Sequence, residues 1–273
     1  MILYEIFCFL WYKVRDVSSE GLCARMTASN SGHGGDTSGK SRFIKVMLTR
    51  TADYDSVSDK AYRQIRADII FGKLAPSEKL KLERLREGYG ASVSTLRELL
   101  NRLASEGLVI AEGQRGFEVA PVSAENLREL AALRLLLESH ALEQSFKAGD
   151  MDWEGRVVSA HHKLSQIEKR LLTGDKADPE TWKRYDFEFH HALISACGSD
   201  ALLETHAPVY DKYLRYQMIA GIFRGAIAAE EHQKLLQCAL SRDSKTARAI
   251  LVVHIEACVD FTLENGKYPF TSR

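Results

Sequence analysis

The sequence lacks several features that would assign it to a class at once. It has no run of 18 apolar residues, so it contains no candidate membrane span. Its 5 cysteines include no CxxC pair and their number is odd, which indicates reduced thiols in an intracellular protein and not a disulfide framework. With only 5 prolines and 18 glycines in 273 residues, collagen and low-complexity fibres are excluded.

Net charge is absent as well, because 37 Lys and Arg balance 37 Asp and Glu. The whole molecule is therefore not a general binder of polyanions. The balance is uneven along the chain, since residues 57–120 carry 11 basic and 9 acidic residues while residues 121–273 carry 19 and 22. Hydrophobic residues make up 45% of the chain, enough for a buried core. The length suggests about two domains.

Residues 1–55 are predicted to form a disordered arm. The apolar opening MILYEIFCFLWYK contains Glu5 and lacks the basic start and the cleavage site of a signal peptide. Residues 27–41 are almost all small or polar and cannot bury a face. Met26 and Met47 offer later starts for translation. We therefore expect the folded part of the chain to begin near residue 56.

Residues 56–121 have the layout of a winged helix-turn-helix. Apolar residues at helical spacing predict helices over 57–71, 80–89 and 92–105, the last with inward-facing Leu96, Leu99, Leu100 and Leu103. The alternating segments LVIA and GFEVA flank EGQR and predict a two-stranded hairpin. A short turn between the second and third helices is typical of units that place one helix in a DNA major groove.

Residues 122–265 are predicted to form an all-α antiparallel bundle, followed by a tail at 266–273, so the fold class is mainly α. No alternating strand pattern occurs after Pro121, and Ser123 is suited to cap the first helix. Glycines and other helix breakers separate the predicted helices, which are 124–147, 152–172, 179–197, 200–220, 226–240 and 243–264.

Short polar and basic side chains near the third helix are candidates for contact with DNA. Hydroxyl groups can donate to phosphates or base edges, and arginine can bind guanine or a phosphate with two hydrogen bonds. Glycines beside the hairpin tip would let it approach a groove closely. The candidates are Lys81, Arg84, Ser92, Ser94, Thr95, Arg97, Arg102, Gln114, Arg115 and Gly116. A solvated charged face would show the same pattern, so these residues alone leave DNA binding open.

Segment 61–120 resembles the winged-helix domain of the GntR family of bacterial transcription regulators. The matching stretches are IIFGKL at 69–74, PSEKL at 76–80, GAS at 90–92, LRELL at 96–100, EGLV at 106–109 and RGFEV at 115–119. The resemblance implies a homodimer that binds a short palindromic operator in double-stranded DNA. It also implies DNA contacts at Arg84, Ser92, Ser94, Arg97 and the hairpin tip.

The second candidate site lies in the helical region. Asp186 and His190 are four residues apart and therefore share one helix face. His232 and His254 lie in two other predicted helices. Three imidazoles and one carboxylate could close around one divalent ion of the Zn, Ni or Mn-like type, with open positions for a ligand oxygen. Because the chain has 9 histidines, such a pattern also arises by chance.

RLLLE at 134–138, DFEFH at 186–190, EH at 231–232 and His254 are together similar to the FCD ligand-binding domain, which defines the FadR-like branch of the GntR regulators. The similarity covers about 123–264 and implies that Asp186, His190, His232 and His254 are metal ligands. Tyr89, LRE at 96–98 and GS at 198–199 resemble the CsiR-type group, which suggests a small dicarboxylate effector.

The predicted function is that of a metabolite-responsive transcription regulator, a repressor at the bacterial nucleoid in the cytoplasm, with no membrane partner and no enzymatic activity. A small organic acid would bind the metal, and Arg134 or Arg215 would pair with its remaining oxygens. Two alternatives stay open. One is a helical metal-dependent hydrolase, although the chain has no HD doublet and no HExxH motif. The other is a helical dimerisation module whose histidines bind nothing.

Overall fold

A computed structural model describes residues 56–113, 116–175, 179–220 and 223–266. By their contacts these residues form two compact units, one of 56–67 with 82–99 and the other of 68–81 with 100–266. Among the described helices, none combines the length and the apolarity that crossing a bilayer requires.

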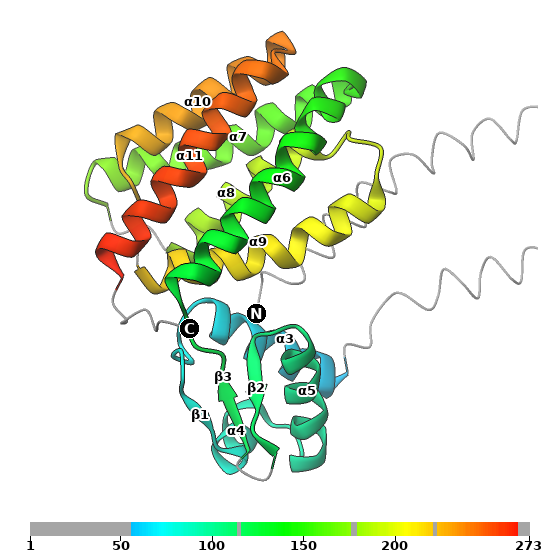
Figure 1. Ribbon diagram of the computed structural model, residues 1–273, viewed down its shortest axis with the longest axis vertical. Helices are drawn as coiled ribbons and strands as arrows, with labels where there is room; N and C mark the ends of the chain where they lie inside the picture. Colours follow the sequence, from blue (N-terminus) through cyan, green and yellow to red (C-terminus); the bar gives the residue numbers. More distant parts are fainter. Residues whose placement is uncertain (1–55, 114–115, 176–178, 221–222, 267–273) are drawn as a thin grey trace, which may run out of the picture. The chain divides into compact units, whose positions relative to one another are not determined.

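The N-terminal elements are three helices and a small sheet (Figure 1). The sheet has the order β1-β3-β2, and both pairs of strands are antiparallel. The leucines predicted to face inward from the third helix are all at most 6% exposed. The elements are α3 (Val57–Ile70), β1 (Lys79–Leu80), α4 (Leu82–Tyr89), α5 (Val93–Ser105), β2 (Val109–Ala111) and β3 (Phe117–Val119).

Strand β1 corrects the predicted start of the second helix. The apolar spacing predicts a helix from Leu80, but Leu80 pairs with Phe117 in the sheet and α4 begins at Leu82. Leu80 is 5% exposed, so its side chain still enters the core, from a strand instead of a helix. A two-residue strand is too short to show the alternation that identifies strands in a sequence.

The helical region contains α6 (Ala124–Ala148), α7 (Met151–Leu172), α8 (Pro179–Ile194), α9 (Asp200–Ala220), α10 (Ala226–Ser241) and α11 (Ser244–Asn265). The predicted helices agree with these bounds to within one residue, except at the end of α8, which was predicted at Cys197. There the N–H of Cys197 donates to the Ile194 carbonyl, three residues back, and Gly198 follows with φ at 73°. A tight last turn and a left-handed glycine end the helix early.

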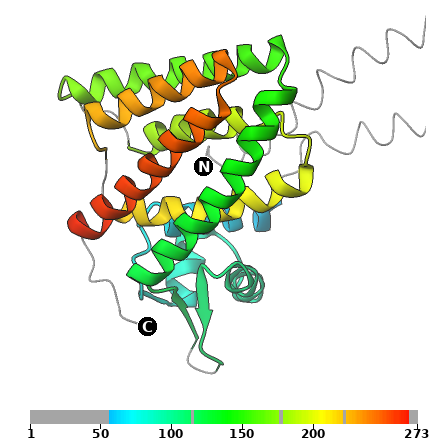
Figure 2. The same cartoon turned by 45° about the horizontal axis from the view of Figure 1, so that its top comes forward.

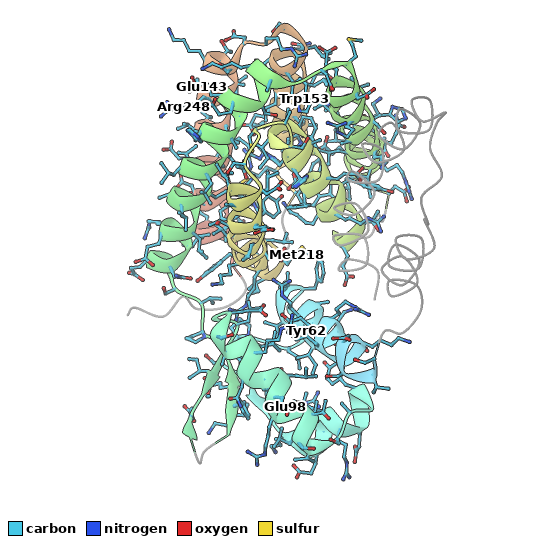
Figure 3. All side chains as sticks on the ribbon, turned by 90° about the vertical axis from the view of Figure 1, so that its right-hand side faces the viewer. Tyr62, Glu98, Glu143, Trp153, Met218 and Arg248 are labelled. Carbon is cyan, nitrogen blue, oxygen red and sulfur yellow. The ribbon has the colours of Figure 1, made fainter. Side chains whose placement is uncertain are left out.

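The six helices pack against one another (Figures 1 and 2), and a core of buried apolar side chains holds them together. Helix α7 packs on α8 and α10, while α6 packs on α8, α9 and α11. Trp153 of α7 is fully buried, and its indole N–H donates to the carbonyl of Ala192 on α8 at 2.9 Å (Figure 3). Ser123 caps α6, as predicted, by accepting a hydrogen bond from the Asn126 N–H at 3.1 Å. Because it packs on α8, α9 and α11, helix α6 contacts three of the helices that surround the candidate site.

Candidate metal site and nucleic-acid interface

The four side chains predicted as metal ligands lie together inside the helical unit. Asp186 and His190 stand one turn apart on α8, His232 is on α10 and His254 is on α11. Each offers one ligand atom, and these atoms lie within 4.8 Å of one another. All four side chains are buried, with exposures of 0% to 4%. The structure thus brings together every residue that the spacing and the resemblance selected.

Each ligand takes a position on the buried stripe of its helix. On α10 the stripe is Ala228, His232, Leu235 and Ala239, all at most 3% exposed. On α8, Asp186 and His190 share the inner face with Leu193. Because the ligands project from regular helices instead of loops, the packing that holds the bundle together also fixes their relative positions.

A glutamate faces the Nδ1 atom of each histidine. Glu168 Oε1 lies 2.8 Å from His232 Nδ1, and Glu231 Oε2 lies 2.7 Å from His254 Nδ1. Glu138 Oε2 lies 3.4 Å from His190 Nδ1, which is an ion-pair distance without hydrogen-bond geometry. A carboxylate at Nδ1 keeps the proton there and leaves Nε2 as the lone-pair donor for a metal.

Several buried nitrogen atoms of the site have no hydrogen-bond partner within the described part of the chain. They are Nδ1 and Nε2 of His190 and Nε2 of His232. An unsatisfied buried polar atom costs about 1–3 kcal/mol, so native structures contain few of them. A metal ion would engage the two Nε2 atoms, and imidazole with carboxylate is a donor set that divalent transition metals accept. The residues present therefore fit an ion.

Asp186 is held with one oxygen toward the imidazoles. Its Oδ1 is 3.4 Å from His232 Nε2. Its Oδ2 accepts a hydrogen bond from the Tyr210 hydroxyl at 2.7 Å and lies 3.4 Å from Lys183 Nζ, which also donates to Gln217 at 2.7 Å. Burial alone would raise the pKa of Asp186, but the opposing charge of Lys183 contributes most to lowering it overall, so the carboxylate is ionised.

The surroundings of His190 and of His254 favour the neutral form of each imidazole. Burial lowers the pKa of His190, and the nearby charge of Arg134 lowers it further, against the opposing effect of Glu138. Burial also lowers the pKa of His254 to about 3. Since metals bind the deprotonated nitrogen, these shifts favour the form of histidine that binds an ion.

Arg134, predicted to bind an effector, is 1% exposed and pairs with Glu138 on the same helix. Its Nε donates to Glu138 Oε1 at 2.6 Å, and its guanidinium lies 4.5 Å from the ring centre of Tyr210. Burial alone would lower the pKa of Arg134, but the Glu138 carboxylate raises it overall. His206 Nε2 is a third partner of Glu138, at 2.8 Å. Arg134 is therefore linked to His190 through Glu138.

Arg215, the other predicted effector residue, is 4% exposed on α9. It donates a hydrogen bond to the backbone carbonyl of Ala120, in the segment that precedes α6. Burial lowers its pKa to about 10. The contact that the structure assigns to Arg215 is thus a structural one, and it does not involve the four clustered ligands.

Sequence reasoning missed Arg224, which precedes α10 and lies beside His254. It donates hydrogen bonds to Glu231 and to Cys258 Sγ, the latter at 3.2 Å, and its NH2 atom is 3.1 Å from His254 Nδ1. Arg224 and Glu168 lie outside the motifs quoted above, and RLLLE at 134–138 contains Glu138 without indicating its role. Each of the three comes from a different helix or connection than the ligand it supports. Only the three-dimensional arrangement identifies them.

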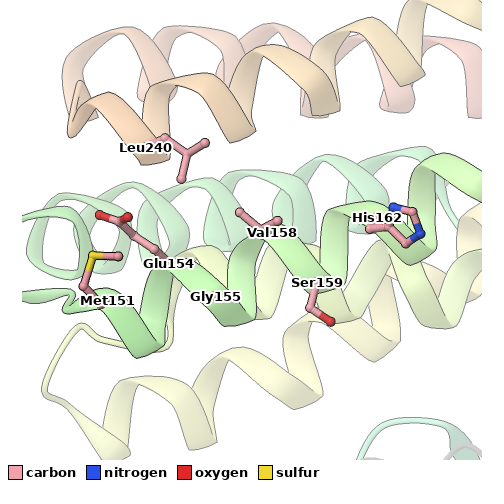
Figure 4. A pocket seen from close by; sticks show the side chains of 7 residues that line it. All are labelled: Met151, Glu154, Gly155, Val158, Ser159, His162 and Leu240. Atoms are coloured by element: carbon pink, nitrogen blue, oxygen red, sulfur yellow. The ribbon is translucent and has the colours of Figure 1, made fainter.

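A separate surface hollow lies between α7 and α10 (Figure 4). It contains none of the residues predicted for DNA, metal or effector binding. Its lining residues are Met151, Glu154, Gly155, Val158, Ser159, His162 and Leu240. The hollow is therefore separate from the buried cluster.

Among the described residues predicted to contact DNA, Arg84 lies on α4, and Ser94, Thr95, Arg97 and Arg102 lie on α5. Lys81, Ser92 and Gly116 directly precede α4, α5 and β3. Arg84, Ser92, Ser94, Arg97 and Arg102 are exposed, as is Lys81, while Thr95 is half-buried. Ser92 caps α5 by accepting a hydrogen bond from the Thr95 N–H at 3.2 Å. Gly116 has φ at 100°, a conformation that favours glycine. Gln114 and Arg115 lie outside the described residues.

Two family models match the chain, and together they cover both regions. Residues 57–119 match the bacterial regulatory proteins of the gntR family, and residues 129–257 match the FCD domain. The first match covers the elements from α3 to β3, and the second contains all four clustered ligands. The two resemblances seen in the sequence are thereby confirmed.

Curated relatives carry the same assignment over most of their length. The HTH-type transcriptional regulator BphR of Paraburkholderia xenovorans (strain LB400) is 35% identical over 235 residues, which is 85% of this chain and 94% of the relative. The HTH-type transcriptional repressor GlaR of Escherichia coli (strain K12) is 30% identical over 201 residues, 71% of this chain and 90% of the relative.

Solved structures support the fold. A GntR transcriptional regulator of Rhodococcus sp. RHA1 matches with a TM-score of 0.63 at 21% identity, over 78% of this chain and 99% of that one. E. coli McbR/YncC matches with a TM-score of 0.64 at 19% identity, over 77% of this chain and 99% of that one. Given the extent of these matches, the chain belongs to the GntR family of bacterial transcription regulators, with an FCD domain after its DNA-binding domain, and is not an enzyme.

Proposed function

We propose that the chain is a metabolite-responsive repressor that binds its operator as a homodimer and releases it when a small carboxylate binds at a metal site in the FCD domain. The observation that carries this proposal is the buried cluster of Asp186, His190, His232 and His254, with ligand atoms within 4.8 Å of one another. The repressor role is supported by GlaR, which is named a repressor.

The charge of the buried site favours a cation. In the part of the chain that the structure describes, the ion pairs around the imidazoles contain four carboxylates and three Lys or Arg side chains. The acids are Asp186, Glu138, Glu168 and Glu231, and the bases are Lys183, Arg134 and Arg224, with side chains at most 11% exposed. With neutral histidines the net charge is −1, and an uncompensated buried charge is costly. A divalent ion of the Zn, Ni or Mn-like type, held by the four clustered ligands, would change it to +1.

Once an ion is bound, the net charge of the buried site favours an anionic effector. A bound ion would offer coordination positions that four protein ligands leave open. A carboxylate at such a position would bring the net charge of the site to zero. Lys183 Nζ lies 3.4 Å from Asp186, and Arg134 contacts Glu138, which in turn lies beside His190. Both cations are therefore close enough to the cluster to attract the anion. An effector releases DNA only if it binds the two conformations of the regulator with different affinities.

We expect His232→Ala and His254→Ala each to abolish stoichiometric metal binding. Each change removes a donor atom. His232→Ala also leaves Glu168 without its imidazole partner in a buried site, whereas Glu231 keeps its ion pair with Arg224 when His254 is replaced. Elemental analysis of the purified protein measures the ion content, and His162→Ala, an exposed histidine outside the cluster, is the control. A wild-type protein without a bound ion after purification in added metal would contradict the site and favour the metal-free dimerisation module.

Glu168→Gln is expected to weaken metal binding by about 10- to 100-fold without removing a ligand, because the neutral amide no longer favours the Nδ1–H form of His232 as strongly. Competition with a chromogenic chelator gives the affinity. The matched control is Glu188→Gln. Glu188 of α8 pairs with Lys163 of α7 and is not part of the metal cluster. Equal affinities in the two variants would show that Glu168 does not orient the ligand.

Arg97→Ala should weaken operator binding by about 1–3 kcal/mol while the fold is kept. Arg97 is exposed on α5, and its loss removes a cation from the helix expected in the major groove. Mobility shifts on the DNA that flanks the gene, at several salt concentrations, measure the effect. Arg170→Ala, an exposed arginine on α7 that pairs with Asp175, should change nothing. The absence of any wild-type retardation at low salt would contradict the proposed function.

The metal-loaded protein is expected to lose operator affinity by about 5- to 150-fold when a small carboxylate binds. Mobility shifts with a panel of mono- and dicarboxylates, each beside its neutral amide, identify the class of effector. His190→Ala should keep the operator affinity and lose the response, because His190 is one of the four clustered ligands and is not among the residues predicted to contact DNA. A full response in that variant, or an equal response to amides, would remove the metal-bound carboxylate from the scheme.

A further inference from the structure

The start of α5 combines three hydroxyl side chains with an apolar side chain that stays partly exposed. Ser92 precedes the helix, and the first turn holds Val93, Ser94, Thr95 and Leu96. Leu96 is fully buried, whereas Val93 is half-buried and keeps part of its surface in contact with solvent. In a helix-turn-helix unit the first residues of the second helix lie closest to the base edges. The hydroxyls and the valine are therefore both placed to act on DNA.

The three hydroxyls form a hydrogen-bonded group of their own. Ser92 Oγ lies 2.8 Å from Ser94 Oγ and 2.9 Å from Thr95 Oγ1, and it accepts a hydrogen bond from the Thr95 N–H at 3.2 Å. These bonds hold the hydroxyls at the N-terminal end of α5, where the helix dipole favours an anion. Their expected partner in DNA is a phosphate. A phosphate contact fixes the position of the helix but carries no sequence information.

The side chain of Val93 cannot contact a phosphate in this way, because it donates no hydrogen bond. Val93 lies four residues before Arg97 and therefore on the same side of α5, and Arg97 is exposed. The methyl groups of Val93 are thus on the side of the helix from which Arg97 is expected to reach DNA. Among the groups that bases present in the major groove, the 5-methyl group of thymine is the apolar one. Thymine is therefore the base that suits Val93.

We infer that Val93 is a specificity-determining residue, which selects thymine in the operator by packing on its 5-methyl group. The inference rests on the operator binding of the proposed function and adds the base that this position reads. Four residues along a helix span about 6 Å, and successive bases of one strand lie about 3.4 Å apart. The thymine therefore lies within about two base steps of the base or phosphate that Arg97 contacts, once in each half-site.

The chemistry of valine makes this contact one of specificity more than of overall affinity. The guanidinium of Arg97 can bind the phosphates of any DNA, but Val93 gains a partner only where a methyl group meets it. At another base the same side chain would cover polar base edges without pairing them, which disfavours that sequence. The β-branched side chain of valine is also stiff at χ1, so little conformational entropy is lost when it packs on the base.

Selection of binding sites from a pool of random DNA by the full chain provides the first test. The wild-type protein should select thymine at one position of each half-site, and Val93→Ala should lose the preference at that position alone. Val93→Arg should select guanine there by about 5- to 150-fold, because arginine binds guanine with two hydrogen bonds. The control Val158→Ala, at a valine of α7 that is 44% exposed, should select the wild-type site. Selection of the wild-type base at every position by Val93→Ala would overturn the inference.

Deoxyuridine in place of the selected thymine tests the methyl group itself, because the two bases differ only there. The wild-type protein should lose affinity by about fourfold, the effect expected for one buried methyl group, as measured by fluorescence anisotropy with a labelled duplex. Val93→Ala should bind the two duplexes equally, because the partner of the methyl group is already removed. Equal weakening of both proteins by deoxyuridine would assign the methyl contact to another side chain and overturn the inference.

Salt dependence separates a local contact from a displaced helix. Val93→Ala should leave the dependence of the binding constant on salt unchanged, because no charge is lost, whereas Arg97→Ala should weaken it. A weaker salt dependence in Val93→Ala would show that α5 has moved on the phosphates, and it would overturn the local contact. A wild-type protein that selects no sequence would contradict the operator binding and the inference together. A selected site that lacks the thymine would overturn the role of Val93 and leave the operator binding intact.

Discussion

The cost of burying ionised groups among apolar helices is the constraint on which the site depends. Glu138, Glu168 and Glu231 are each surrounded by protein, and each is matched by an arginine or an imidazole within hydrogen-bond or ion-pair distance. Removing either partner would leave an uncompensated buried charge, which is far more costly than the pair itself. The carboxylates are therefore fixed by their partners, and they in turn fix the imidazoles, so the direction in which the lone pairs of the histidines point follows from the electrostatics of the surrounding residues.

The same constraint explains why one site can serve both an ion and an organic anion. A buried set of acids and bases that sums to −1 is poised for a cation, and once the cation is present the sum favours an anion. Neither preference depends on the surface hollow between α7 and α10, which lies apart from the cluster. The net charge of −1 requires neutral imidazoles, because a protonated His190 or His254 would cancel the attraction of the site for the ion. Burial provides that neutrality by lowering the pKa of both groups.

Residues within one helix were predictable from the sequence, and contacts between helices were not. The spacing of Asp186 and His190 places them on one face of any helix, and the resemblance to the FCD domain supplied His232 and His254. Glu168 gave no signal, because its partner is 64 positions further along the chain and only packing of α7 on α10 brings them together. Helix bounds agreed with the prediction for most helices. They failed where a two-residue strand precedes α4 and where a tight final turn ends α8 at Ile194 instead of the predicted Cys197.

Helix α6 is the element in which these separate features meet. Its two sides differ in character at the centre of the helix. Arg134 and Glu138 are buried beside the metal cluster, whereas Leu133 and Leu136 are exposed. A helix with only a structural role would need an apolar inner face and a polar outer one, and α6 has nearly the reverse at its centre. Both departures carry a stability cost in an isolated chain, since buried charges and exposed leucines are each unfavourable. The charge network around His190 offsets the first cost, because Glu138 lies between Arg134 and His190. The same carboxylate also pairs with His206 of α9, so one buried glutamate of α6 connects the metal cluster on α8 to a third helix. A change at His190 therefore reaches α6 and α9 through Glu138 alone, without any loop between them.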